Sequence, residues 1–252
     1  PDAGLVDYGF DDEGKLTSKV TPNLRAAGEE IAYSYELGRL VAIDYPAGTP
    51  DVSYTYGAMG APNNGAGRVV RSEDGSRIVE REFAPTGAVV LETAEMKLHA
   101  WHNPGTDPAL FRWTTEWSYD GLARLETLVY PDGERLAYDY DSGGLIKSIV
   151  GEEDGFKLQQ SGVDQDGNPI FIQVPHTWSY EYLRDQQYDE FLHRRYQEVG
   201  NGATSEYTYD ADTQWLTRQQ TLSPNRNVRD PAYVEIQDLN YTYDDVGNPL
   251  TY

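Results

Sequence analysis

The sequence predicts an all-β protein made of tandem antiparallel β-hairpins. A short motif, aromatic–x–aromatic–Asp–x–x–Gly, recurs from one end of the chain to the other. The residue between the two aromatic positions is Gly, Ser, Thr, Asp or Glu in every copy, which is the alternation expected of a half-buried strand. Turn-forming residues follow each motif at short spacing. Together these features favour many short strands joined by regular turns.

The motif occurs in ten copies, and the shortest intervals between them set a basic unit of about 21 residues. Some copies are complete and others keep only part of the pattern. The complete copies begin at Tyr8, Tyr138 and Tyr241. The partial copies begin at Tyr33, Tyr54, Arg81, Trp117, Ser161, Tyr180 and Tyr207.

Each unit is predicted to contain two strands and two turns. The two rings stand at positions i and i+2, so they share one face of a strand. The Asp can accept hydrogen bonds from the backbone two residues later, and the Gly can adopt positive φ, so this pair marks the first turn. A pair of Leu or β-branched residues then forms the return strand. A Tyr-Pro-x-Gly sequence at 45–48 and 130–133 marks the second turn.

Three segments interrupt the repeat, at 88–116, 183–206 and 217–240, and we treat them as irregular insertions in a single array over residues 1–252. The stretch from Trp178 to Tyr196 carries a partial apolar stripe, which suggests a short helix. The chain begins at Pro1 without a methionine, so we expect it to be a fragment of a longer polypeptide.

The charge balance excludes several kinds of partner. There are 42 acidic and 20 basic residues, for a net charge of −22. Nucleic acids and anionic membranes need clustered Lys and Arg, so neither is expected to bind. No apolar run is long enough to span a membrane. The acidity has two interpretations: it keeps an edge-rich β-array soluble, or it attracts a net basic partner.

No catalytic, cofactor-binding or metal-binding residue is predicted. The chain has no Cys, which removes thiol chemistry and Cys-based zinc sites. His99 and His102 would lie on opposite faces of a strand and could not share a metal ion. The run from Asp164 to Asn168 resembles the start of a calcium loop, but Pro175 stands where that loop needs an acid.

Two alternatives to a purely structural interpretation involve carbohydrate. A pair of acids could act as in a glycosidase, but the acids recur once per unit and therefore suggest a repeated structural role. A cluster of Trp101, Trp113 and Trp117 could stack on a sugar. We favour the interpretation that these rings cap the apolar seam between hairpins.

Two segments carry a family resemblance. Residues 117–155 combine Ser-Tyr-Asp, Tyr-Pro-Asp-Gly and Tyr-Asp-Tyr-Asp-x-x-Gly-Gly-Leu, and residues 237–248 read Gln-Asp-Leu-Asn-Tyr-Thr-Tyr-Asp-Asp-Val-Gly-Asn. Both resemble the YD repeats of Rhs proteins, including the B/C components of Tc-type toxins and the similar teneurins. The resemblance implies hairpins wound into a curved, spiralling sheet, here an arc of a β-shell or barrel. The paired-Asp autoprotease segment and the toxin domain of that family are absent from the sequence.

The resemblance also implies a function. It indicates a non-enzymatic encapsulating or scaffolding segment of a secreted Rhs-type toxin protein, with no cofactor. The partners would be the protein's own C-terminal toxin cargo or other shell segments. The alternative is an extracellular adhesion or carbohydrate-binding module on the same repeat sheet, with glycans as ligands. Either function places the protein outside the cell or at the cell surface.

Overall fold

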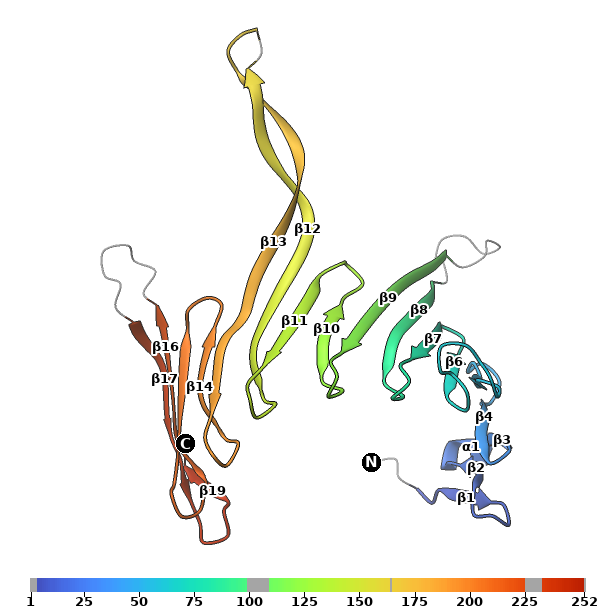
Figure 1. The fold of residues 1–252 in the computed structure, drawn as a ribbon. Coiled ribbons are helices and arrows are strands. Elements are labelled where there is room, and N and C mark those ends of the chain that lie inside the picture. The colour runs from blue at the N-terminus through green and yellow to red at the C-terminus, as the bar shows by residue number, and fades with distance from the viewer. Residues whose placement is uncertain (1–3, 99–108, 164, 225–232, 252) are drawn as a thin grey trace. The chain divides into compact units, whose positions relative to one another are not determined.

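The computed structural model describes residues 4–98, 109–163, 165–224 and 233–251 and confirms the all-β prediction. The chain divides into two compact units, Pro1–Trp117 and Ser118–Tyr252. Both are made almost entirely of antiparallel strands, nearly all of which pair with the next strand along the chain (Figure 1). The chain is therefore a series of tandem hairpins, as the repeat predicts.

The first unit contains the single helix of the described residues. Helix α1 (Pro22–Ala27) begins after Thr21, whose hydroxyl accepts a hydrogen bond from the Leu24 N–H, and ends at Gly28 in the left-handed conformation. The strands of this unit are β1 (Asp7–Phe10), β2 (Leu16–Val20), β3 (Ile31–Glu36), β4 (Arg39–Asp44), β5 (Val52–Tyr56), β6 (Val69–Glu73), β7 (Arg77–Phe83), β8 (Val89–Leu98) and β9 (Ala109–Tyr119), which extends two residues past the boundary.

The second unit continues the same pattern and contains the two longest strands of the protein. Its strands are β10 (Leu125–Val129), β11 (Arg135–Tyr140), β12 (Ile146–Val163), β13 (Pro169–Tyr188), β14 (Arg194–Val199), β15 (Thr204–Tyr209), β16 (Leu216–Pro224), β17 (Tyr233–Asn240), β18 (Thr242–Tyr243) and β19 (Pro249–Thr251). Strands β18 and β19 pair only with each other in the described residues.

A bulge precedes the second ring of the repeat in hairpin after hairpin. The pairing register shifts between the polar residue and the ring that follows it, as at Asp139/Tyr140 and Thr208/Tyr209. The same shift occurs at Gly9/Phe10, Ser34/Tyr35, Thr55/Tyr56, Glu82/Phe83, Gln187/Tyr188 and Thr242/Tyr243. A bulge bends the strand and redirects the side chain that follows it. The repeat motif is therefore a bulge-and-turn unit.

The units have little buried core for their size. The rings of Tyr138 and Tyr140 are half-buried and Asp139 between them is exposed, as the alternation predicts. Among the described residues, the buried apolar side chains are Val79, Phe83, Ala94, Leu136 and Leu183. Contacts between neighbouring hairpins must therefore supply much of the stability, as in other repeat proteins.

The structure corrects two expectations in the second unit. The predicted helix between Trp178 and Tyr196 is wrong, because this stretch is the end of β13, a turn and the start of β14. The repeat copy assigned to Tyr180 is also wrong, because β13 runs on to Tyr188 without a turn. The alternation of apolar residues along β13 has the two-residue period of a strand, which overrides the partial helical stripe.

The three segments that interrupt the period contain paired strands wherever they are described. Strands β8 and β9 pair across residues 88–116. Strands β13, β14 and β15 occupy 183–206, and β16 pairs with β17 within 217–240. The extra residues of 88–116 and 217–240 thus lengthen the strands of their hairpins, whereas β14 and β15 within 183–206 have six residues each, like β3 and β4.

Candidate functional site

The second ring of the repeat links each hairpin to the one before it. The Tyr140 hydroxyl donates a hydrogen bond of 2.7 Å to the carbonyl oxygen of Leu125, the first residue of the preceding return strand. Four other tyrosines at the same motif position make the equivalent bond. These bonds join Tyr56 to Leu40, Tyr188 to Ile146, Tyr209 to Arg194 and Tyr243 to Leu216. The hydroxyl explains why tyrosine outnumbers phenylalanine at this position.

The repeat Asp holds the turn that follows the second ring. One carboxylate oxygen of Asp141 accepts hydrogen bonds from the N–H groups of Gly143 and Leu145, at 2.8 and 2.9 Å. Each bond replaces one that the turn backbone would otherwise make to water. The equivalent carboxylates are those of Asp11, Asp120, Asp189, Asp210 and Asp244, and Asp74 makes the same bonds in the turn between β6 and β7.

These turn bonds stabilise the charged form of several carboxylates. The pKa of Asp120 is lowered, first by the backbone N–H of Arg124 and further by the Arg124 side chain. The pKa of Asp210 is lowered by the backbone N–H and then the hydroxyl of Thr213. The pKa values of Asp74 and Asp244 also lie below the ordinary range for the same kind of reason.

These pKa shifts predict a loss of stability in acid. A carboxylate whose folded pKa is depressed contributes stability above its unfolded pKa of about 3.9, and that stability is lost as the pH falls through the lower folded value. We expect Asp120→Asn to melt at a lower temperature than wild type at pH 6, with the difference shrinking towards pH 3. Asp139→Asn, on the exposed face outside any turn, controls for the loss of one charge. A difference that stays constant down to pH 3 would contradict the prediction.

A residue other than Gly occupies the left-handed position of one turn. Ala123 stands in the motif's Gly position and has φ 61°, whereas Gly144 in the next unit has φ 82°. This conformation costs an ordinary residue about 1 kcal/mol. We expect Ala123→Gly to raise the free energy of unfolding by about 0.5–1 kcal/mol in urea denaturation. The matched change Ala137→Gly, within β11, should lower it, and stabilisation by both would contradict the strain argument.

Cations of the return strand or turn lie over the repeat rings. The guanidinium of Arg124 is 4.4 Å from the ring centre of Tyr140, and that of Arg194 is 5.7 Å from the ring centre of Tyr207. The pairs Lys15–Tyr35, Arg39–Tyr56 and Arg68–Phe83 have the same arrangement. Each such pair at a partly exposed site adds about 0.5–1 kcal/mol of attraction. The rings of Tyr56 and Tyr140 are therefore held by their own chain both on one face and at the hydroxyl.

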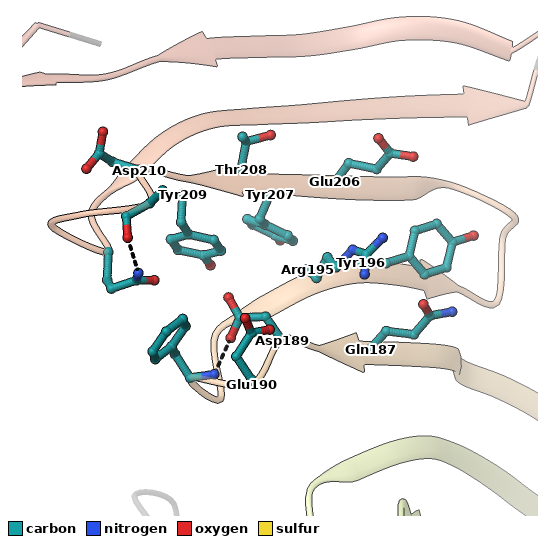
Figure 2. A pocket seen from close by; sticks show the side chains of 13 residues that line it. Gln187, Asp189, Glu190, Arg195, Tyr196, Glu206, Tyr207, Thr208, Tyr209 and Asp210 are labelled. Atoms are coloured by element: carbon teal, nitrogen blue, oxygen red, sulfur yellow. Dashed lines mark hydrogen bonds between the residues drawn. The ribbon is translucent and has the colours of Figure 1, made fainter.

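An open depression of about 760 Å³ lies between two successive repeat turns of the second unit. Figure 2 shows Tyr207 and Tyr209 pointing from β15 toward the turn that carries Asp189 and Glu190. The ring of Tyr209 stacks on His193 with centres 4.6 Å apart, and its hydroxyl is bonded to Arg194. The acids Asp189 and Asp210 are engaged by turn N–H groups. The depression thus combines aromatic rings with two acids that the repeat turns use, and with Glu190 and Glu206, which lie outside the motif positions.

Of the residues considered for chemistry, Trp113 and Trp117 lie four positions apart on β9 and so share one face of that strand. His99, His102 and Trp101 lie outside the described residues, as does Asp164 of the calcium-like run. Within the part of the chain that is described, no group of three or more His, Asp or Glu could hold a metal ion. No described helix is long and apolar enough to cross a membrane. The predicted lack of catalytic, cofactor and metal residues stays a prediction.

Two features of the repeat were missed in the sequence. Gln186-Gln187-Tyr188-Asp189 is a copy that lacks the first ring, yet Tyr188 and Asp189 make the bonds of a full copy. The adjacent residues Tyr188 and Asp189 are the sequence signal from which this copy could have been recognised. In the turn of Asp210, positive φ falls on Gln214 and not on Thr213, because this turn is one residue longer.

Comparisons with known proteins agree with this architecture. No family model matches the chain. A 55-residue stretch, 22% of this chain and 6% of the relative, is 44% identical to the toxin subunit YenC2 of Yersinia entomophaga. The TcdB2-TccC3-TEV crystal structure superposes with a TM-score of 0.72 at 21% identity, over 98% of this chain and 11% of that chain.

A second solved structure gives the same result. The Photorhabdus luminescens Tc holotoxin pore with a mutation in TccC3 has a TM-score of 0.71 at 22% identity, over 99% of this chain and 11% of that chain. The chain thus spans a small part of the proteins it matches. The resemblance to Rhs and Tc-type YD-repeat proteins, made from the sequence, is confirmed, and the fold is the one found in these toxin structures.

Proposed function

We propose that this chain is a structural wall segment of a secreted Rhs/Tc-type toxin protein. Its hairpins form part of a β-shell around a C-terminal toxin cargo, and it has no enzymatic activity of its own. The neighbouring partners of the wall are other segments of the same shell. The cargo would be retained by the wall without a specific binding site for a small molecule.

The hydrogen bond from the second repeat ring to the preceding hairpin carries this proposal. It recurs in five hairpins of the described residues, so one hairpin is fastened to the next by the same device. A wall must resist opening between any two strands, and a regular fastening provides this resistance at each seam. The fold similarity over nearly the whole chain to TcdB2-TccC3 supports the same role.

The use of the acids supports a non-enzymatic role. In a glycosidase, two carboxyl groups must remain available to the substrate. Two of the four acids that line the depression, Asp189 and Asp210, instead accept hydrogen bonds from their own turns, and the other two, Glu190 and Glu206, are exposed side chains of the same turn and of β15. The depression lies where two successive repeat turns come together.

The test is limited proteolysis of the full-length polypeptide that carries this chain. We expect the segment C-terminal to the repeats to resist trypsin in the wild type. In the double variant Tyr140→Ala/Tyr209→Ala, which loosens two seams, that segment should be cut several times faster. The double variant Tyr138→Phe/Tyr207→Phe keeps all the rings and should behave like wild type. Equal cleavage rates in the wild type and in the Tyr140→Ala/Tyr209→Ala variant would overturn the proposal.

The adhesion or carbohydrate-binding alternative has weaker support, because the rings in the depression already contact His193 and Arg194. A glycan array probed with this chain distinguishes the two functions. Specific binding that is lost in Tyr207→Ala, together with unprotected cargo in the proteolysis test, would favour the alternative.

A further inference from the structure

The hairpin of β12 and β13 extends beyond the strands on either side of it. The two strands pair with each other from Ile149–Leu183 out to Val163–Pro169. The pairing of β11 with β12 ends at Glu152, and the pairing of β14 with β13 begins at Leu183. Residues 153–163 and 165–182 therefore form a two-stranded ribbon that pairs with no other strand of the described residues, visible in Figure 1 as the long extension of the second unit.

One face of this ribbon carries a continuous apolar stripe. Alternate residues of a strand share a face, and in β13 every even-numbered position from 170 to 182 is aliphatic or aromatic. The stripe consists of Ile170, Ile172, Val174, His176, Trp178, Tyr180 and Tyr182. Trp178 is 42% exposed and Ile172 is 47% exposed. His176 is the one polar ring among the first five of these positions, and a stripe of this length is typical of a covered surface.

The opposing strand leaves the stripe open. The residues of β12 that pair with the stripe are small or polar: Gly151 opposes Tyr180, Gly155 opposes His176, and Gly162 opposes Ile170. The indole nitrogen of Trp178 is 3.5 Å from where a Cβ on Gly155 would be. Because glycine has no side chain, nothing on β12 projects beside the large rings that these glycines oppose. The rings of His176 and Trp178 meet edge to face, with their centres 4.4 Å apart.

The ribbon should be unstable without a cover. An isolated two-stranded hairpin is marginally stable in water, and three strands or a packed face are needed for independent stability. Phe156, Leu158 and Phe171 on the second face are also more than half exposed, at 65%, 67% and 53%. The sequence nevertheless maintains the pairing over the full length of the ribbon, which a free surface loop would not require.

The edges of the ribbon are less suited to a partner than its face. Pro169 and Pro175 in β13 have no N–H to offer to an added strand. Strand β12 has a register shift between Gln160 and Gly162, which interrupts its free edge. Prolines and bulges are the usual means by which edge strands avoid pairing with other chains. A partner is therefore expected to pack on the stripe and not to extend the sheet.

The charge of the ribbon selects the kind of partner. Residues 153–182 contain five acids and one lysine, Lys157, which lies exposed on the stripe face opposite Val174. Glu153 lies on the stripe face opposite Trp178 and forms no ion pair with the described residues. Glu134 accepts a hydrogen bond from Tyr182 at the base of the stripe. Two copies of the ribbon packed together would bring these acids close to one another, which disfavours a second copy.

We propose that the stripe face of the β12–β13 ribbon is a docking surface for a polypeptide whose contact face is apolar with Lys or Arg at its margin. The apolar centre of that partner would cover Ile172, Val174 and Trp178, and its cations would meet Glu153 and Glu134. This inference goes beyond the wall function, since the ribbon could hold such a partner whether or not the sheet encloses a cargo.

The test measures binding of a fluorescein-labelled peptide of alternating Val and Lys to the whole chain by fluorescence anisotropy. An extended peptide of this kind has one apolar and one basic face. Salt at about 150 mM limits long-range attraction to the net charge of the chain. Two matched peptides serve as controls, one with Glu in place of Lys and one with Ser in place of Val. We expect only the Val–Lys peptide to bind.

Variants assign that binding to the stripe. Ile172→Ser/Trp178→Ser should weaken binding by ~tenfold or more, since centrally placed anchors dominate interface energies. Gln173→Ser, on the opposite face, should leave it unchanged. A chain in which residues 155–176 are replaced by Asn-Gly keeps the base of the hairpin and should lose the binding, with circular dichroism checking its fold. Equal binding by this shortened chain would overturn the proposal, as would ribbon-dependent dimerisation in analytical ultracentrifugation.

Discussion

Replacing Tyr140 with alanine is expected to lower the free energy of unfolding by about 2–3 kcal/mol, the lower part of the range for a large side chain, because the ring is only half-buried. Three contacts are lost together. The hydroxyl bond to the Leu125 carbonyl disappears, the guanidinium of Arg124 loses the ring beneath it, and the bulged end of β11 loses its apolar contact. Urea denaturation of the whole chain measures the change.

Two phenylalanine variants separate the ring from the hydroxyl. Tyr140→Phe keeps the ring and should cost about 1 kcal/mol, the net value of one hydrogen bond. Tyr138→Phe removes a hydroxyl that makes no hydrogen bond to the described residues, and should cost almost nothing. If Tyr140→Phe is as stable as Tyr138→Phe, the hydrogen bond from Tyr140 to the Leu125 carbonyl contributes nothing to stability, and the proposed wall function loses its main support.

Placing a methyl group on Gly200 is expected to destabilise the second unit by more than about 3 kcal/mol, beyond the usual cost of overpacking. A Cβ on this residue would lie 1.4 Å from the carbonyl oxygen of Glu181. The obstacle is backbone and cannot rotate away. The Gly200 N–H also donates to the Tyr182 carbonyl at 3.3 Å, so the clash would break the contact that closes the base of the ribbon.

Gly121→Ala is the matched control for this variant. A Cβ at Gly121 would meet nothing within 4 Å, and φ there is not in the left-handed region. It should therefore melt close to wild type, while Gly200→Ala melts well below it or fails to fold. Thermal melts followed by circular dichroism compare the two. Equal melting of both variants would show that β13 and the 199–203 turn can separate without cost.

The local features of the fold follow from short-range sequence patterns. The strand at Tyr138–Tyr140, the Asp141 turn and the positive φ of Gly144 all depend on residues within four positions of one another. Their chemistry is complete inside one hairpin, so a single copy of the motif predicts them. For the same reason, the Asp189 turn could have been recognised from Tyr188-Asp189 alone.

Contacts between hairpins depend on distances along the chain that no motif fixes. Tyr188 bonds to Ile146, 42 residues earlier, while Tyr140 bonds to Leu125, 15 residues earlier, although both bonds join a second-ring hydroxyl to the first carbonyl of the preceding strand. The difference is the length of the ribbon, and nothing in a period of about 21 residues specifies it. The pairing of β12 with β13 places the Tyr188 hydroxyl beside the Ile146 carbonyl, the contact that the second ring makes in other copies. That pairing also left seven aliphatic or aromatic side chains of β13 on a face that no other strand covers, because strand pairing between distant segments decides which strands lie beside β13.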